Sequence, residues 1–206
     1  LMLVPAKKIL DKANKGYYAV PHFNINNLEI LKAVVDACRE LNSPVIIGTS
    51  EGAIDYAGMD YITSMVHTAA KKEKFPIALH VDHGKDMQVI RKAINSGYTS
   101  VMYDGSSLPY KENVANTKKV VRMARKKKVS VEAEIGVLAG VEDKVKVSKQ
   151  AARFTNPDEA VMFAKETKCD SLAIAIGTSH GAYKFKGETK LNYKILREVK
   201  ERTRMP

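Results

Sequence analysis

Residues 77–84 read Ile77-Ala78-Leu79-His80-Val81-Asp82-His83-Gly84, an apolar run that ends in polar side chains. The run is short and apolar on both sides, as buried parallel strands are. Alternation along a strand would place Ala78, His80 and Asp82 on one face. The stretch therefore predicts a buried strand with an acid at its carboxyl end and with His83 at the start of the following loop.

The rest of the chain repeats this pattern, because short apolar runs alternate with longer amphipathic segments. Strands are expected at Tyr17–Val20, Pro44–Gly48, Pro76–Val81, Ser100–Tyr103, Ser130–Ala133 and Ser171–Ile176. Helices are expected at Ala6–Asn14, Asn27–Leu41, Asp60–Lys72, Met87–Asn95, Lys111–Lys127, Pro157–Glu166 and Asn192–Arg202. Asn26 and Asn156 are expected as helix N-caps, and Gly97 as a helix end. Strand–helix alternation repeated about six times indicates a βα array in a single domain, residues 1–206.

Such an array is either a doubly wound sheet or a TIM (β/α)8 barrel. Polar residues follow nearly every expected strand, and they are His22, Asn24, Thr49, Ser50, Asp82, His83, Asp104, Glu134, Ser179 and His180. In a barrel these strand ends converge on one mouth, whereas in an open sheet they spread along an edge. No glycine-rich phosphate loop follows the first strand, which weakens a dinucleotide-binding interpretation. The fold class expected is thus α/β, a TIM barrel with about six of its eight βα units in this chain.

Composition limits the classes of partner. The 206 residues are 45% hydrophobic, and the formal net charge is +11, which favours anionic partners such as phosphorylated metabolites or nucleic acid. A solvated surface is the simpler explanation, and the cations of Arg125–Lys128 also complement a helix dipole. Aromatic residues are not interleaved with the charges, so nucleic acid is not expected.

No apolar run approaches the ~18 residues of a membrane span. Cys38 and Cys169 are expected as free thiols in a reducing cytoplasm.

The last expected strand opens into Gly177-Thr178-Ser179-His180-Gly181. Glycines let a chain approach a ligand closely, and exposed backbone N–H groups can hold a phosphate. His83 and His180 could share a metal ion, and imidazole nitrogens suit zinc. Two loop histidines can also coincide by chance, and His80 within its strand is more simply a satisfied core residue.

Several motifs then resemble the class II, zinc-dependent fructose-bisphosphate and tagatose-bisphosphate aldolases. These motifs occur in the family's order and cover essentially the whole chain. The five motifs are Ala19-Val20-Pro21-His22-Phe23-Asn24-Ile25-Asn26-Asn27, Leu79-His80-Val81-Asp82-His83-Gly84, Tyr98-Thr99-Ser100-Val101-Met102-Tyr103-Asp104-Gly105-Ser106, Val131-Glu132-Ala133-Glu134-Ile135-Gly136 and Ala175-Ile176-Gly177-Thr178-Ser179-His180-Gly181. The resemblance implies an aldehyde-lyase that reversibly cleaves fructose 1,6-bisphosphate to dihydroxyacetone phosphate and glyceraldehyde 3-phosphate.

The resemblance also implies roles for individual residues. His83 and His180 match two of three zinc histidines, and Asp104 and Glu134 match acids that orient ligands or hold a second cation. Asp82 matches the acid that exchanges the hydroxyl proton. Glu142 matches a loop acid that acts at the carbon of dihydroxyacetone phosphate. The substrate-facing positions that match are Asn24, Ser50 and Gly181.

The chain departs from the family pattern in three places. The third zinc histidine is expected after a further strand beyond Pro206, so residues 1–206 alone are expected to show little activity. Ala139 stands before Gly140 where the family usually has two glycines, and His22 stands where many relatives have another residue. A tagatose-bisphosphate aldolase stays open as an alternative, as does a non-catalytic protein that binds phosphometabolites or nucleic acid. The family implies a homodimer or homotetramer.

Overall fold

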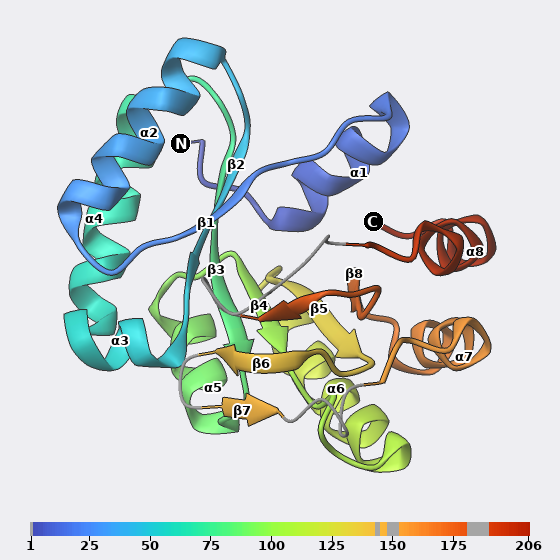
Figure 1. Cartoon of the computed structure of the whole chain (residues 1–206). Helices are drawn as coiled ribbons and strands as arrows, with labels where there is room; N and C mark the ends of the chain where they lie inside the picture. The colour runs from blue at the N-terminus through green and yellow to red at the C-terminus, as the bar shows by residue number, and fades with distance from the viewer. Residues whose placement is uncertain (1, 143–144, 148–152, 181–189) are drawn as a thin grey trace.

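The computed structural model describes residues 2–142, 145–147, 153–180 and 190–206 (Figure 1). The helices are α1 (Ala6–Gly16), α2 (Leu28–Leu41), α3 (Glu51–Ala57), α4 (Met59–Lys72), α5 (Met87–Ser96), α6 (Tyr110–Arg125), α7 (Pro157–Thr167) and α8 (Tyr193–Thr203). The strands are β1 (His22–Asn24), β2 (Val45–Thr49), β3 (Ile77–Gly84), β4 (Ser100–Tyr103), β5 (Ser130–Ile135), β6 (Ala139–Glu142), β7 (Val145–Val147), β8 (Ser171–Ile174) and β9 (Ser179–His180).

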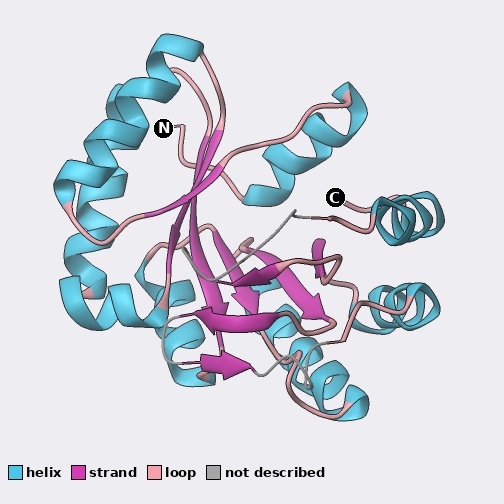
Figure 2. Cartoon of the chain, in the orientation of Figure 1, coloured by secondary structure: helices cyan, strands magenta, loops and turns pink. Residues whose placement is uncertain are grey.

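The main sheet settles which α/β architecture the chain adopts. Its six strands have the order β1-β2-β3-β4-β5-β8, and every neighbouring pair is parallel. This order follows the chain without the reversal that marks the switch point of a doubly wound sheet. Helices surround the outside of the curved sheet (Figure 2). The predicted partial TIM barrel is therefore confirmed, and the doubly wound alternative is not.

The two faces of the sheet bury different side chains. Leu79 and Val81 of β3 belong to the large core between the strands and the surrounding helices. Ala78 instead packs with Ala6 and Ile9 of α1 in a smaller cluster on the other face. The backbone N–H of Val4 also donates to the carbonyl of Ile77 over 2.8 Å, which ties the start of α1 to the amino end of β3. The polar residues that remain on the inner face thus lie toward the opposite, carboxyl end.

Helix ends follow from local hydrogen bonds. The Asn156 side chain caps α7 by accepting from the backbone N–H of Asp158, and Gly97 ends α5 with a φ of 102°. Both assignments confirm the sequence prediction. For α2 the prediction of Asn26 was wrong, because Asn27 accepts from the N–H of Ile30 at 2.9 Å.

The first strand was also predicted wrongly. Tyr17 is 97% exposed and takes a left-handed φ of 56° as the C-cap of α1, so the apolar residues 17–20 connect α1 to β1 rather than forming a strand. The strand begins at His22 and pairs with β2. Its short length explains the error, since three residues give little periodicity to detect.

A helix and a small sheet were not predicted. Ser50 caps α3 by accepting from the N–H of Ala53, so the polar residues after β2 open a helix. A three-stranded sheet of order β7-β6-β9 follows the carboxyl ends of β5 and β8. Strands this short pair through their backbones and carry weak sequence signals.

Two expectations about the chemical environment can be compared with the described residues. Cys38 and Cys169 are both free, as predicted, and both are buried. Among the helices of the described residues, none is both long enough and apolar enough to cross a membrane.

Candidate active site

A bulge at the carboxyl end of β3 sets the direction of two consecutive side chains. The register runs from Val81 opposite Val101 to Gly84 opposite Tyr103, so β3 contains one more residue than β4 across this stretch. His83 takes a φ of 48°, which is uncommon for a residue with a side chain. Strict alternation would send Asp82 and His83 to opposite faces, but a bulge re-aims side chains. His83 was predicted to begin a loop, but it belongs to β3. The bulge in this strand sets the direction of the His83 side chain.

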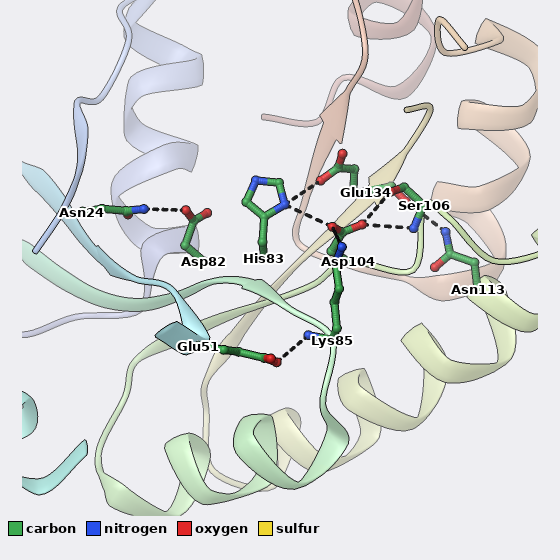
Figure 3. A network of polar contacts seen from close by, with 9 residues as sticks. All are labelled: Asn24, Glu51, Asp82, His83, Lys85, Asp104, Ser106, Asn113 and Glu134. Carbon is green, nitrogen blue, oxygen red and sulfur yellow. Dashed lines mark hydrogen bonds and ion pairs between the residues drawn. The ribbon is translucent and has the colours of Figure 1, made fainter. Parts of the chain in front are cut away.

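His83 lies between two carboxylates at the mouth of the sheet. Its Nδ1 is 3.1 Å from Oδ2 of Asp104 and 3.3 Å from Oε2 of Glu134 (Figure 3). One candidate ligand atom from each residue lies within 4.8 Å of the others. The three residues come from the carboxyl ends of β3, β4 and β5, so neighbouring strands assemble the cluster. One imidazole nitrogen and two carboxylate oxygens form a donor set that fits a zinc ion.

The Asp104 carboxylate is held in its charged form. Burial would raise its pKa, but interactions with His83 and Ser106 and the charge of Lys85 together lower the pKa below its ordinary value. Oδ1 accepts from the Ser106 hydroxyl at 2.6 Å and from the Ser106 backbone N–H at 3.1 Å. These contacts leave Oδ2 facing His83. A charged, fixed oxygen is what a cation site requires.

Asp82 lies beside this cluster and contacts the first strand. Oδ2 of Asp82 accepts from Nδ2 of Asn24 at 2.7 Å. Burial would raise the pKa of Asp82, but His83 and the Asn24 hydrogen bond outweigh burial and lower it. The sheet thus brings together the predicted proton-exchanging acid and a predicted substrate-facing amide, although these residues are 58 positions apart.

Two further ionisable groups lie deeper on the inner face. His80 is 1% exposed, and its Nδ1 lies 2.8 Å from Oγ of Ser100. Burial lowers the pKa of His80. Its Nε2 lies 3.7 Å from Oε2 of Glu132, whose pKa burial and the charge of Asp82 raise to about 7. His80 is therefore the buried, hydrogen-bonded residue that the simpler interpretation expected.

Of the remaining predicted residues, one is described with its side chain, and the other three are not. Ser50 lies at the carboxyl end of β2, but its hydroxyl caps α3. The backbone of His180 lies in β9, opposite Gly140 of β6, and β6 ends at Glu142. The side chains of His180 and Glu142, and all of Gly181, lie outside the described residues.

Four residues around the site were not predicted. Oε1 of Glu51 accepts from the backbone N–H groups of Lys85 and Asp86 at 2.7 and 2.8 Å, which fixes the turn after β3. Asn113 of α6 donates to the carbonyl of Glu134 at 2.9 Å. Ser106 could have been found, because Asp-Gly-Ser after a strand favours a side-chain-capped turn. Glu51, Lys85 and Asn113 carry no local signal of this kind.

Comparison with known proteins agrees with the fold and identifies the family of the chain. The sequence model of the family described as "Fructose-bisphosphate aldolase class-II" matches residues 4–206. This chain belongs to the class II fructose-bisphosphate aldolase family, a family of lyases, as the sequence predicted.

Relatives with known names support the same conclusion. A fructose-bisphosphate aldolase of Helicobacter pylori is 50% identical over 206 residues, which is 100% of this chain and 67% of the relative. The D-tagatose-1,6-bisphosphate aldolase subunit GatY of Klebsiella oxytoca is 41% identical, over 100% of this chain and 72% of that protein. The crystal structure of the YdjI aldolase from Escherichia coli K12 matches with a TM-score of 0.84 and 32% identity, over 99% of this chain and 70% of that one. The chain thus spans about two thirds of the length of these relatives.

Proposed function

We propose that the protein catalyses the reversible, zinc-dependent aldol cleavage of fructose 1,6-bisphosphate to dihydroxyacetone phosphate and glyceraldehyde 3-phosphate. The observation that carries the proposal is the meeting of His83, Asp104 and Glu134 at the carboxyl ends of three neighbouring strands, with Asp82 beside them. In barrels of this kind, catalytic groups belong at that end. We also propose that residues 1–206 act as part of one catalytic barrel domain.

Each residue of the site then has a defined task. His83, with His180, would hold the zinc ion, and Asp104 and Glu134 would orient His83 or hold a second cation, divalent or monovalent. When bound, zinc supplies Lewis-acid stabilisation of negative charge on the substrate oxygens. Asp82 is charged and hydrogen-bonded to Asn24, so it is ready to accept a hydroxyl proton in the cleavage direction.

The remaining predicted residues would act on the other parts of the substrate. Glu142 would move the proton at the carbon of dihydroxyacetone phosphate, and Gly181 would contact a phosphate through its backbone. Ser50, which directly follows β2, would face the substrate from the carboxyl end of that strand. The net charge of +11 also suits a bisphosphate substrate. A homodimer or homotetramer in the cytoplasm completes the proposal.

Substrate turnover by the whole protein tests this function. We expect formation of triose phosphates from fructose 1,6-bisphosphate, loss of activity with a chelator, and recovery with zinc. Borohydride added with substrate should leave the activity unchanged, because no Schiff base is required. His83→Ala should abolish activity, whereas His67→Ala, which changes a histidine on α4 that contacts the carbonyl of Gly97, should not. Activity that survives metal removal, or that borohydride destroys, would contradict the proposal.

The Klebsiella oxytoca relative makes tagatose 1,6-bisphosphate the natural second substrate to compare. The two ketoses are epimers that differ at one hydroxyl. The ratio of kcat/KM for the two sugars decides between them, and we expect it to favour fructose 1,6-bisphosphate.

A further inference from the structure

The contact between Asn24 and Asp82 depends on the orientation of the Asn24 amide. Nδ2 of Asn24 donates to Oδ2 of Asp82 at 2.7 Å. An amide turned by half a rotation would direct its oxygen at the carboxylate, which cannot donate a hydrogen bond when it is charged. Something must therefore favour the orientation with the NH₂ group toward Asp82.

His22, two residues earlier on β1, provides such a partner. Nε2 of His22 and Oδ1 of Asn24 both lie in the space beside Gly48 of β2. Because Nδ2 of Asn24 is directed at Asp82, the amide oxygen is the atom that remains for His22. A hydrogen bond between the two side chains would therefore have His22 donate through a ring N–H, and it would complete a chain from His22 through Asn24 to Asp82.

Gly48 of β2 makes the space in which these two side chains meet. A Cβ placed on Gly48 would lie 2.1 Å from Nε2 of His22 and 2.2 Å from Oδ1 of Asn24. The two atoms therefore share the space above Gly48, and any larger residue there would displace them. Asn24 lies opposite Gly48 in the register of β1 and β2, so the backbone pairing fixes this geometry.

The ring of His22 also packs against a second histidine ring. It packs edge-on against the ring of His80, with centroids 5.3 Å apart and an angle of 90° between the planes. His80 is buried, and its Nδ1 contacts Oγ of Ser100 at 2.8 Å. One side of His22 is open to solvent along β1. The buried histidine thus provides a fixed surface against which the ring of His22 packs.

We propose that His22 is a positioning residue, which fixes the amide of Asn24 above Gly48 and thereby holds the carboxylate of Asp82 in its reactive orientation. The proposal rests on the function proposed above, since Asp82 is taken as the proton-exchanging acid. It does not require His22 to contact the substrate. It predicts that the effect of His22 reaches the reaction only through Asn24.

Three variants of the whole, zinc-loaded protein separate the hydrogen bond from packing. His22→Phe keeps a flat ring against His80 but removes the donor, whereas His22→Gln keeps an N–H group near the position of Nε2. We expect His22→Phe to lower kcat about tenfold with little change in KM, because a displaced catalytic group slows the reaction strongly. His22→Gln should retain kcat within about threefold of the unchanged protein. Gly48→Ala, which fills the shared space, should behave like His22→Phe.

A double-mutant cycle tests whether the effect runs through Asn24. In an Asn24→Ala background, His22→Phe should change kcat by less than about twofold, since residues that act through one contact are not additive. An equal loss of kcat in both backgrounds would overturn the proposal, as would a His22→Phe protein with unchanged kcat. A His22→Gln protein as slow as His22→Phe would overturn it too. His67→Phe serves as the matched control, with thermal melting to verify folding of each variant.

A measurement that does not depend on turnover keeps this proposal separate from the proposed function. The side-chain NH₂ signals of Asn24 can be assigned by NMR from their loss in Asn24→Ala. We expect the hydrogen-bonded proton to move toward the position of a solvent-exposed amide in His22→Phe and to stay in His22→Gln. An unmoved signal in His22→Phe would overturn the positioning role, whatever the activity of the protein. Absence of aldol cleavage by the unchanged protein would overturn only the proposed function.

Discussion

At the scale of single residues, the site depends on two neighbours that reach the same space. Asp82 and His83 follow each other in β3, and a regular strand would separate them. The register shift before Gly84 and the left-handed φ of His83 place both beside the mouth of the sheet. The sequence marked both residues as candidates because acids and imidazoles are uncommon at the end of an apolar strand. The bulge itself had no sequence signal, since it arises from pairing with β4.

Asp82→Asn gives the first prediction at this scale. The amide keeps the size of the side chain but cannot accept a proton, so we expect kcat to fall by about 10²–10⁴-fold. KM and the melting temperature should change little, because Asp82 is not part of the apolar core. Steady-state kinetics on fructose 1,6-bisphosphate measure the effect. A variant with normal kcat would remove Asp82 from the reaction.

Glu132→Gln gives a second prediction, which concerns stability in the metal-free protein. The pKa of Glu132 is raised from 4.5 to about 7 in the fold, so the folded state favours the neutral carboxyl. The unchanged protein should therefore lose stability as the pH rises from about 4.5 through about 7, by at most about 3 kcal/mol. The variant stays neutral and should lack this loss. Urea unfolding at about pH 5 and pH 8 measures the difference, which should grow at the higher pH. A difference independent of pH would show that Glu132 ionises normally.

At the scale of elements, the strands and helices with a clear pattern of apolar residues could be predicted from the sequence. The short strands and the short helix could not. Burial on both faces made β2 to β5 visible as apolar runs, and helix α7 carried Asn156 followed by Pro157 as a start signal. The three-residue strand β1 and the helix α3 lacked such signals. Tyr17–Val20 was mistaken for a strand because its apolar residues resemble one, whereas the chain there leaves α1 through a left-handed Tyr17.

The cap of α7 gives the prediction that belongs to this scale. Oδ1 of Asn156 accepts from the N–H of Asp158 at 2.8 Å and of Glu159 at 3.4 Å. Asn156→Ala removes the acceptor and should lower the free energy of unfolding by about 1 kcal/mol. Asn156→Ser, the matched control, should retain most of the stability. Urea denaturation of both variants tests this, and equal stability of the alanine and serine proteins would show that the cap does not matter.

At the scale of the whole molecule, the arrangement of strands explains why distant residues form one site. Asn24, Asp82, Asp104 and Glu134 stand at the carboxyl ends of β1, β3, β4 and β5, so a sheet in chain order collects them. The sequence predicted this convergence from polar residues after apolar runs. It could not predict Glu51 or Asn113, because their roles depend on contacts with the turn after β3 and with the backbone of β5.

The central claim is that His83 helps to hold a zinc ion at this mouth, and anomalous diffraction at the zinc edge tests it most directly. Crystals of the whole protein should show a zinc peak about 2.0–2.1 Å from an imidazole nitrogen of His83. The peak should disappear in His83→Ala and persist in His67→Ala. A fully occupied zinc elsewhere, with the ring of His83 directed away from Asp104 and Glu134, would contradict the account.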